Sequence, residues 1–394
     1  MSRIIFDESS FAMKITLSLL SSKPIEINNI RVLEADMGLK EHEKSFLNLI
    51  KHITLGTKIE ISTTEDNVIF TPGTIEGGDL DVFECSNSRS LSYYIEYLLL
   101  LLPFARENTV IGLSGVTDAD EELSLDVIKD VTIPSLKYFG IGRSSTSRGA
   151  FDLQIPRRGM PPLGKGLAVL RVPSVNQLNV VDFTDPGLIH DIRGIVCTAR
   201  CQTQFGRSAA FSAKGLFQQL LSDIDIATRH YGKDKSGDSP GFSMELHATS
   251  TSQAMLSSSA CACSIEGRHI THYTPESLGK KCAERLFREI SEGGVVDSSH
   301  QVIMMVLMTL APEKMSRIRI GRITPRSIRV LRLLKEFFGV SFNLQTADER
   351  WVQKCIREKK EVTKREKRSK HGEQESIICV CQGIGYKNVA RQVK

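Results

Sequence analysis

Segments with the periodicity of a helix alternate with short strand-like segments along most of this chain, and this alternation restricts its fold most strongly. Apolar residues recur at helical spacing in one set of segments and at every second position in the other. The helical segments are residues 11–20, 40–53, 92–102, 121–139, 276–291 and 324–338. The strand-like segments are residues 24–30, a hairpin over 59–70, then 109–113 and 340–344, while 302–310 fits a buried strand or a buried helix.

Two of these helices end in the same way. Gly140 follows Leu-Lys-Tyr-Phe, Gly339 follows Leu-Lys-Glu-Phe-Phe, and an apolar residue comes next in each case. Glycine at a helix exit supplies the left-handed cap. The repeated helix–strand segments therefore predict an α+β fold of α/β repeats, in which three repeated units form one large body.

Residues 184–275 differ in composition and pattern from the repeated helix–strand segments on either side. They contain a predicted helix at 208–223, a polar loop at 232–241 and a strand of small residues at 257–264. We expect a smaller inserted α/β domain here. The predicted domains are thus 1–183 with repeats 1 and 2, the insertion 184–275, and 276–394 with repeat 3.

Composition excludes several classes of protein. Of the 394 residues, 41% are hydrophobic and 25% charged, which suits a globular chain. The apolar runs at 98–102 and 302–308 are far shorter than the roughly 20 residues of a membrane span, and the acidic N-terminus does not resemble a signal peptide. The nine cysteines are an odd number without a regular framework, which favours a reducing compartment, and they form no Cys-x-x-Cys pair.

A metal site at Cys261, Cys263, His269 and His272 is the alternative to a buried strand in that region. The spacing is far from common zinc patterns, so we predict the strand and no metal.

Positive charge is concentrated in one segment near the C-terminus. The net charge of the chain is +5, but residues 354–370 hold nine Lys/Arg and three Glu and so carry +6. This basic insertion, 354–376 with its flank, precedes a predicted last strand at 376–381. It fits a solvated surface segment, a nuclear localisation signal or a phosphate-binding surface. Its candidate contact residues are Lys359, Lys360, Lys364, Arg365, Lys367 and Arg368.

The loop at 157–168 is the most distinctive motif. It reads Arg-Arg-Gly-Met-Pro-Pro-Leu-Gly-Lys-Gly-Leu-Ala, a glycine- and proline-rich connection with an anion-binding character. It resembles the signature Arg-Gly-x-x-Pro-x-Gly-Gly-Gly of the RNA 3′-terminal phosphate cyclase family, with Lys165 in place of the middle glycine. Residues 22–25 and 29–31 are similar to the family's first strand. Further short matches resemble, more narrowly, the eukaryotic cyclase-like branch that acts in ribosome assembly, and they lie at 38–40, 45–47, 71–73 with 77–78, 102–104, 236–241 and 383–386.

The resemblance also shows what this chain lacks. Family members transfer AMP from ATP through a nucleophilic histidine, and they carry a glycine-rich run near the N-terminus. Residues 5–9 here contain no glycine, and Asp7 and Glu8 would repel phosphate. Counting back from the strand at 340–342 places Arg326 at the histidine position, and arginine cannot form the adenylylated intermediate. The nearest histidine, His300, is a poor candidate for a displaced nucleophile.

The resemblance therefore implies a non-catalytic cyclase-like factor of small ribosomal subunit assembly that needs no cofactor. It would act in 18S pre-rRNA processing within the nucleolar processome, with the small-subunit precursor particle and a ribosome-assembly GTPase as partners and with no membrane association. Its expected location is the nucleus and nucleolus. The former substrate groove would bind RNA or another anion through Arg157, Arg158, Lys165 and Arg326.

Two enzymatic alternatives remain open. An endoribonuclease that cleaves pre-rRNA could use Arg332 and Lys335 as cations, but Leu333 stands where a carboxylate would be wanted. An active RNA 3′-phosphate cyclase would need a nucleophile that the sequence does not offer.

Overall fold

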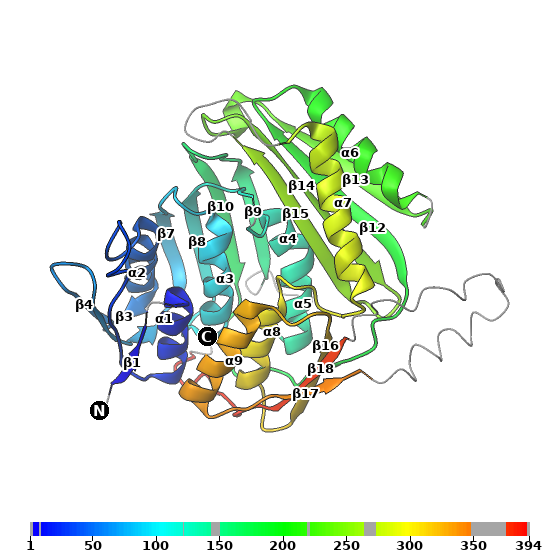
Figure 1. Cartoon of the computed structure of the whole chain (residues 1–394). Coiled ribbons are helices and arrows are strands. Elements are labelled where there is room, and N and C mark those ends of the chain that lie inside the picture. The colour runs from blue at the N-terminus through cyan, green and yellow to red at the C-terminus, as the bar shows by residue number, and fades with distance from the viewer. Residues whose placement is uncertain are drawn as a thin grey trace.

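Three four-stranded sheets in this protein share one strand order (Figure 1). The computed structural model describes residues 3–7, 9–120, 122–142, 150–218, 221–263, 273–347 and 376–391. In each of the three sheets the first two strands are parallel and the other two pairs antiparallel. A helix crosses between the parallel strands, as such pairs require. The mixed α/β class is confirmed, and the shared strand order supports the prediction of three units.

The first sheet has the order β1-β2-β5-β4. Its unit comprises β1 (Ile4–Phe6), α1 (Phe11–Ser21), β2 (Ile25–Ile27), α2 (Glu41–Ile53), β4 (Lys58–Ile61) and β5 (Val68–Thr71), with the small pair β3 (Thr54–Leu55) and β6 (Thr74–Ile75) beside it.

The second sheet has the order β7-β8-β10-β9. Its strands are β7 (Gly78–Glu84), β8 (Thr109–Gly115), β9 (Asp152–Arg157) and β10 (Gly166–Val172). Its first helix is α3 (Leu91–Leu101), extended by η1 (Leu102–Phe104). The second runs through α4 (Leu125–Val127), the π turn η2 (Ile128–Thr132), α5 (Ile133–Leu136) and η3 (Lys137–Phe139).

The third sheet has the order β11-β16-β18-β17 and is interrupted by the insertion. Its elements are β11 (Asp182–Phe183), α8 (Gln301–Leu310), β16 (Met315–Ile320), α9 (Pro325–Phe338), β17 (Asn343–Thr346) and β18 (Ile377–Gln382). The segment left open as strand or helix is thus α8, the crossover between β11 and β16.

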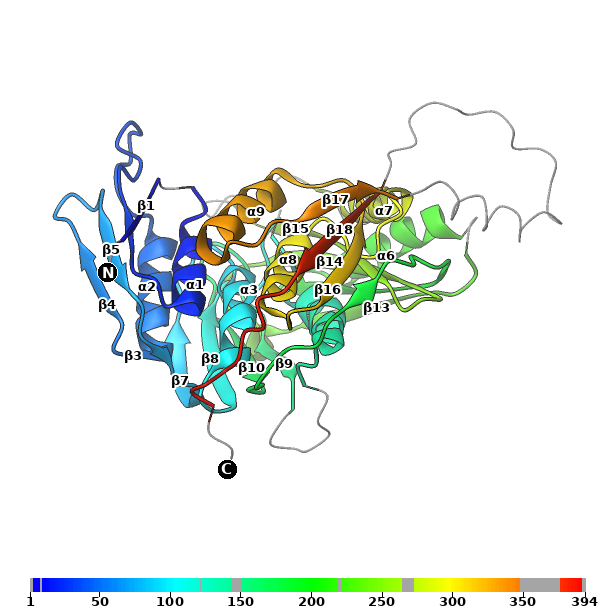
Figure 2. The ribbon, with the colours of Figure 1, turned by 90° about the horizontal axis from the view of Figure 1, so that it is seen from below.

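Three apolar helices form the centre of the body. The residues of α8 are all buried, and so are nearly all of those in α1 and α3, since sheets and helices surround them. A helix that is apolar on every side is stable only in such a place. Seen from below, α1, α3 and α8 lie side by side with the strands outside them (Figure 2).

The insertion forms a separate layer of sheet and helices. Its sheet has the order β13-β12-β14-β15, from β12 (Ile189–Ala199), β13 (Ile224–Tyr231), β14 (Gly241–Ser250) and β15 (Met255–Cys263). The helices α6 (Thr203–Phe217) and α7 (Pro275–Ser291) pack on one face, and η5 (Lys233–Lys235) lies in the connection after β13. Its apolar cluster extends to Leu286, past the predicted boundary at 275. That packing favours assigning α7 to the insertion.

Most predicted helices and strands are confirmed. Where an element begins or ends elsewhere than predicted, the difference has a physical cause. The caps at Gly140 and Gly339 have φ angles of 90° and 71°, in the left-handed region. The helix predicted at 208–223 begins earlier, at Thr203, because its buried face consists of the small residues Gly206, Ala209 and Ala213 and carries little apolar periodicity. The basic segment 354–370 lies outside the described residues. No described helix is long and apolar enough to cross a membrane.

Candidate functional site: an arginine pocket between the body and the insertion

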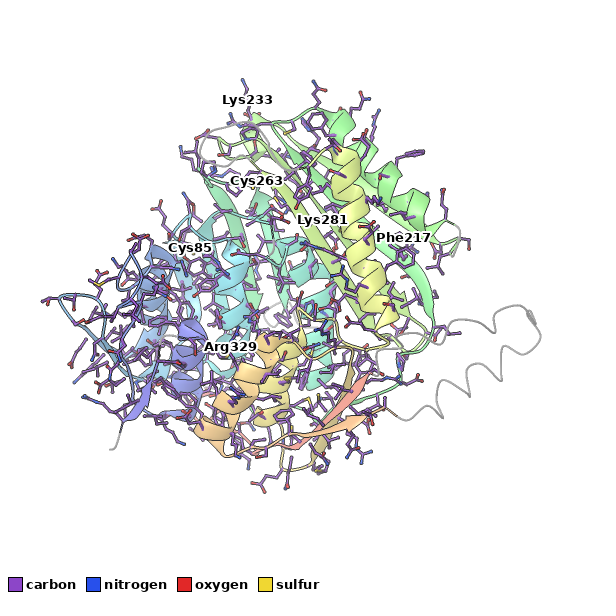
Figure 3. All side chains as sticks on the ribbon, in the orientation of Figure 1. Cys85, Phe217, Lys233, Cys263, Lys281 and Arg329 are labelled. Carbon is purple, nitrogen blue, oxygen red and sulfur yellow. The ribbon has the colours of Figure 1, made fainter. Side chains whose placement is uncertain are left out.

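A pocket of 670 Å³ lies where the body meets the insertion. The body side is built from α1, α3 and α9, and the other side from β15 and α7. Figure 3 shows Arg329 on α9 in the body and Lys281 on α7 above it, which marks the two sides of this region. The pocket is therefore formed by residues far apart in the sequence.

Arginines give this pocket its character. Five of them line it, Arg89, Arg285, Arg288, Arg326 and Arg329, against three glutamates, Glu96, Glu122 and Glu289. Because five positive charges face at most three negative ones, the pocket attracts anions. We call it the arginine pocket.

The five arginines are not equivalent. Arg89 is ion-paired with Glu122 and lies over the ring of Tyr93. Arg285 donates to the carbonyl oxygen of Ser259 at 2.7 Å. By contrast, Arg288 and Arg329 are exposed and form no ion pair with any residue that the structure describes. These two guanidinium groups, one from the insertion and one from the body, are free to bind a ligand.

Arg326 is held at the first turn of α9. Thr324 caps this helix by accepting a hydrogen bond from the backbone N–H of Ser327, and Pro325 occupies the first helical position. Its Nη2 lies 2.8 Å from Oε1 of Glu96. Burial is the largest single effect on the pKa of Arg326 and lowers it, but Glu96 and Tyr97 together raise it more, so the net shift is upward. Arg326 therefore stays charged and is neutralised by its partner.

Glu289 is the titratable group of the pocket. Burial and the nearby carboxylate of Asp297 raise its pKa to about 7, although the backbone N–H and hydroxyl of Ser298 donate to it at 2.9 and 2.5 Å. The charge of the pocket therefore changes around neutral pH.

Comparison with known proteins identifies the family. The profile of the RNA 3′-terminal phosphate cyclases matches residues 9–344. This chain belongs to that family.

Full-length relatives agree with this assignment. The "RNA 3′-terminal phosphate cyclase-like protein" of Homo sapiens is 36% identical over 381 residues, covering 97% of this chain and 95% of the relative. A "probable" protein of the same name from Dictyostelium discoideum is 35% identical over 389 residues, 97% of each chain. The "rRNA processing protein rcl1" of Schizosaccharomyces pombe is 30% identical over 385 residues, 97% of this chain and 95% of the relative. The resemblance to the cyclase-like branch is confirmed.

Within this cyclase-family chain, the structure does not bring the four predicted groove residues together. Only Arg326 lines the arginine pocket. Arg157 is exposed on β9, and the Lys165 ammonium is 2.7 Å from Oδ2 of Asp238 at the surface. Arg158 is turned inward.

Arg158 requires a correction, because its side chain is only 1% exposed. Its guanidinium donates to both oxygens of Asp118 at 3.2 Å and to those of Asp126 at 2.6 and 2.5 Å. It also lies over the ring of Tyr231 in the insertion, 5.4 Å from the ring centre. This arginine connects the body with the insertion and presents no charge to a ligand.

The glycines of the same loop have a packing role. A Cβ on Gly159 would lie 2.3 Å from the backbone nitrogen of Gly166, and one on Gly237 would lie 1.9 Å from the carbonyl oxygen of Gly164. Only glycine permits this approach of the loop to the connection at 236–241 of the insertion. Here the family's signature loop is a junction between the two parts of the chain.

His300 is buried and does not line the arginine pocket. Its Nδ1 is 2.7 Å from Oδ1 of Asp297, and its Nε2 is 2.7 Å from the hydroxyl of Thr132. Burial is the largest single effect on the pKa of His300 and lowers it, but the carboxylates of Asp297, Glu96 and Glu289 together raise it more. Both ring nitrogens are engaged, so the geometry does not favour a displaced nucleophile.

The N-terminal segment is neutralised locally. Asp7 accepts a hydrogen bond from the buried Lys14 ammonium at 2.7 Å, and this interaction lowers the pKa of Asp7 despite the opposing effect of burial. Ser10, at the start of α1, lines the arginine pocket. The predicted repulsion of phosphate by Asp7 is therefore weakened by a paired cation, while Glu8 lies outside the described residues.

Other predicted residues are placed as follows. Cys261 and Cys263 lie on β15, which confirms the strand, whereas His269 and His272 are outside the described residues. The described part of the chain holds no cluster of His, Cys, Asp and Glu suited to a metal. Lys359, Lys360, Lys364, Arg365, Lys367 and Arg368 are also outside it.

Sequence reasoning found Arg326 but missed Arg285, Arg288 and Arg329 of the pocket. Arg285 and Arg288 are three residues apart on α7, and Arg326 and Arg329 have the same spacing on α9. Residues at this spacing share one helix face. Two such pairs on predicted amphipathic helices were a usable signal, but nothing in the sequence shows that the two faces meet.

Proposed function

We propose that this chain is a non-catalytic cyclase-like factor of small ribosomal subunit assembly. It would support 18S pre-rRNA processing within the nucleolar processome, binding the precursor particle and associating with a ribosome-assembly GTPase. The observation that carries the proposal is the arginine pocket, which has cations for an anion and no histidine or cysteine among its described lining residues.

The chemistry of AMP transfer supports the non-catalytic part. A covalent adenylate needs a nucleophile that can lose a proton, and imidazole does so near neutral pH. Arg326, the residue at the family's histidine position by the alignment of short motifs, stays protonated beside Glu96. It can attract a phosphate but cannot form a bond to it.

The relatives support the ribosomal part. One full-length relative carries rRNA processing in its name, and this chain matches it over nearly its whole length. An RNA-binding assembly factor uses exposed cations that contact phosphates without reading sequence. Arg288 and Arg329 provide these, and they come from the two parts of the molecule. The nuclear and nucleolar location and the GTPase partner follow from the family resemblance.

The endoribonuclease alternative gains no support from α9. Arg332 and Lys335 are exposed there, but the position between them is the buried Leu333. Leu333 has no group that can act as a base, so we do not propose cleavage.

A labelling experiment tests the loss of catalysis. Purified chain is incubated with ATP labelled at the α-phosphate and with RNA ending in a 3′-phosphate. We expect neither covalent AMP on the protein nor a cyclised RNA end. Either product would overturn the proposal and make His300→Ala the next variant.

A second experiment tests the assembly role. Cells depleted of the chain should accumulate unprocessed 18S precursors, and the wild-type chain should sediment with small-subunit precursors. The double variant Arg288→Ala/Arg329→Ala should lose this association. The control Lys51→Ala/Lys58→Ala removes two exposed charges elsewhere and should retain it. Normal 18S processing after depletion would refute the role.

A further inference from the structure

The outer face of α6 presents an aromatic ring to solvent. Phe211 is 82% exposed. The helix packs on the sheet of the insertion through Gly206, Ala209, Ala213 and Phe217, which are all buried, so Phe211 points the other way. Figures 1 and 3 show α6 at the outer edge of the molecule, with α7 between it and the body. An exposed phenyl ring on a regular helix contributes nothing to the core.

Two cations flank this ring on the same helix. Arg207 precedes Phe211 by four residues and Lys214 follows it by three, so the three side chains share one face. Both cations are exposed, and neither forms an ion pair with a residue that the structure describes. Residues 203–217 contain no aspartate or glutamate. The face therefore carries two uncompensated positive charges around one π surface.

We propose that this face of α6 is a binding platform for single-stranded RNA. One base would stack on the ring of Phe211, and the guanidinium of Arg207 and the ammonium of Lys214 would contact the flanking phosphates. Aromatic rings between cations bind single strands in this way without reading sequence. The inference rests on the RNA association proposed above and adds a contact site that is separate from the arginine pocket.

The size of the apolar surface favours RNA over a protein partner. One aromatic side chain buries about 150–250 Å², whereas a stable protein interface needs about 800 Å² on each side. Leu216, the other exposed apolar residue of α6, is only half as exposed and lies off the face of Phe211. A single ring suffices for one base, and its charged neighbours match a phosphate backbone.

The platform is distinct from the arginine pocket because α7 separates them. The close packing of α6 and α7 depends on Gly279, where a Cβ would lie 2.2 Å from the carbonyl oxygen of Ala209. Arg285 and Arg288 of α7 line the pocket, and Figure 1 shows α7 between α6 and the body. Variants at one site therefore leave the other intact.

Tryptophan fluorescence tests the stacking directly. The chain has one tryptophan, Trp351, so the double variant Trp351→Phe/Phe211→Trp places the only indole on the platform. Titration with an oligouridylate should quench this emission as the base stacks on the indole. RNA that binds, by anisotropy of a labelled strand, without any quenching would overturn the inference.

Affinity measurements supply the second test. Phe211→Ala should weaken binding of labelled oligouridylate at least about fivefold, the lower end for one base stacked on an aromatic ring. The matched control Leu216→Ala removes an apolar side chain from the same helix and should change nothing. Because Phe211 is exposed, Phe211→Ala should keep the wild-type circular dichroism and unfolding temperature. Equal affinity of Phe211→Ala and wild type would also overturn the inference.

Salt dependence tests the two cations. Arg207→Ala/Lys214→Ala should flatten the slope of log K against log salt by about 1.4, since each phosphate contact to a single strand contributes about 0.7. Lys51→Ala/Lys58→Ala should leave the slope unchanged.

The outcomes also separate this inference from the proposed function. If only Arg288→Ala/Arg329→Ala weakens RNA binding, the platform is refuted and the RNA association stands. If the wild-type chain binds no RNA, both are refuted. If Phe211→Ala releases the chain from precursor particles without affecting oligouridylate, the face docks a protein and the inference is again wrong.

Discussion

The buried Arg158 should be one of the most costly residues in this chain to replace. Its guanidinium is the counter-charge of Asp118 and Asp126, which are themselves buried. Arg158→Met keeps most of the side-chain volume but leaves two carboxylates without a cation in a dry environment. Removing one partner of a buried ion pair costs about 3–5 kcal/mol.

The free-energy cost of Arg158→Met can be measured by thermal unfolding. With an unfolding entropy of about 2.1 cal/mol/K per residue, that cost corresponds to a drop of about 4–6 °C for a chain of 394 residues. The triple variant Arg158→Met/Asp118→Asn/Asp126→Asn removes the stranded charges and should recover most of the loss. An unfolding temperature within about 1 °C of wild type for Arg158→Met would refute this reasoning.

An exposed pair provides the control for burial. Arg193 donates to both oxygens of Asp223, at 2.6 and 2.9 Å, but at the surface of the insertion. Water screens such pairs, so their contribution to stability is small. Arg193→Met breaks a bidentate pair of the same chemistry and should shift the unfolding temperature far less than Arg158→Met. Equal shifts would show that burial is not the cause.

Three further predictions follow from single positions. Sulfate should bind the arginine pocket more tightly at about pH 6 than at about pH 8, because Glu289, with a pKa of about 7, ionises over that range, and Glu289→Gln should abolish the difference in a calorimetric titration. The pKa of His300 is raised by carboxylates that include Asp297. The stability that His300 contributes is therefore complete below its ordinary pKa and is lost as the pH rises through its raised pKa. In thermal unfolding, His300→Gln should destabilise the protein more at about pH 6 than at about pH 9. Gly339→Ala forces alanine to a φ of 71° and should lower the free energy of unfolding by about 1 kcal/mol, whereas Gly215→Ala, inside α6 with open space around its Cβ, should raise it by about 0.5–1 kcal/mol in denaturant unfolding.

Local sequence signals were sufficient for most of the fold. The helix at 11–20 and the caps at Gly140 and Gly339 were predicted because periodicity and cap chemistry are properties of neighbouring residues. The segment 302–310 was ambiguous because a buried helix and a buried strand are both continuous apolar runs. The structure shows a helix there, α8, between β11 and β16 in the chain.

The candidate site was harder to predict because its residues interact across long sequence distances. Arg158 was expected in a groove on the basis of its loop, but its charge is compensated by Asp118 and Asp126, 40 and 32 residues away. The partner of Arg326, Glu96, is still more distant in sequence. A motif shows that an arginine is present; the packing decides whether its charge is buried, paired or free.

The arrangement of charges around the arginine pocket suits holding an anion better than transforming one. Two of its arginines are neutralised by Glu96 and Glu122, and the exposed Arg288 and Arg329 come from opposite parts of the molecule. The Arg158 network and the glycine contacts of its loop already join those two parts. The helices that carry Arg288 and Arg329 are therefore held in position before an anion binds, which reduces the entropic cost of binding. The proposed non-catalytic role requires only that the pocket stabilise the bound anion, whereas catalysis would require a group that interacts more strongly with the transition state.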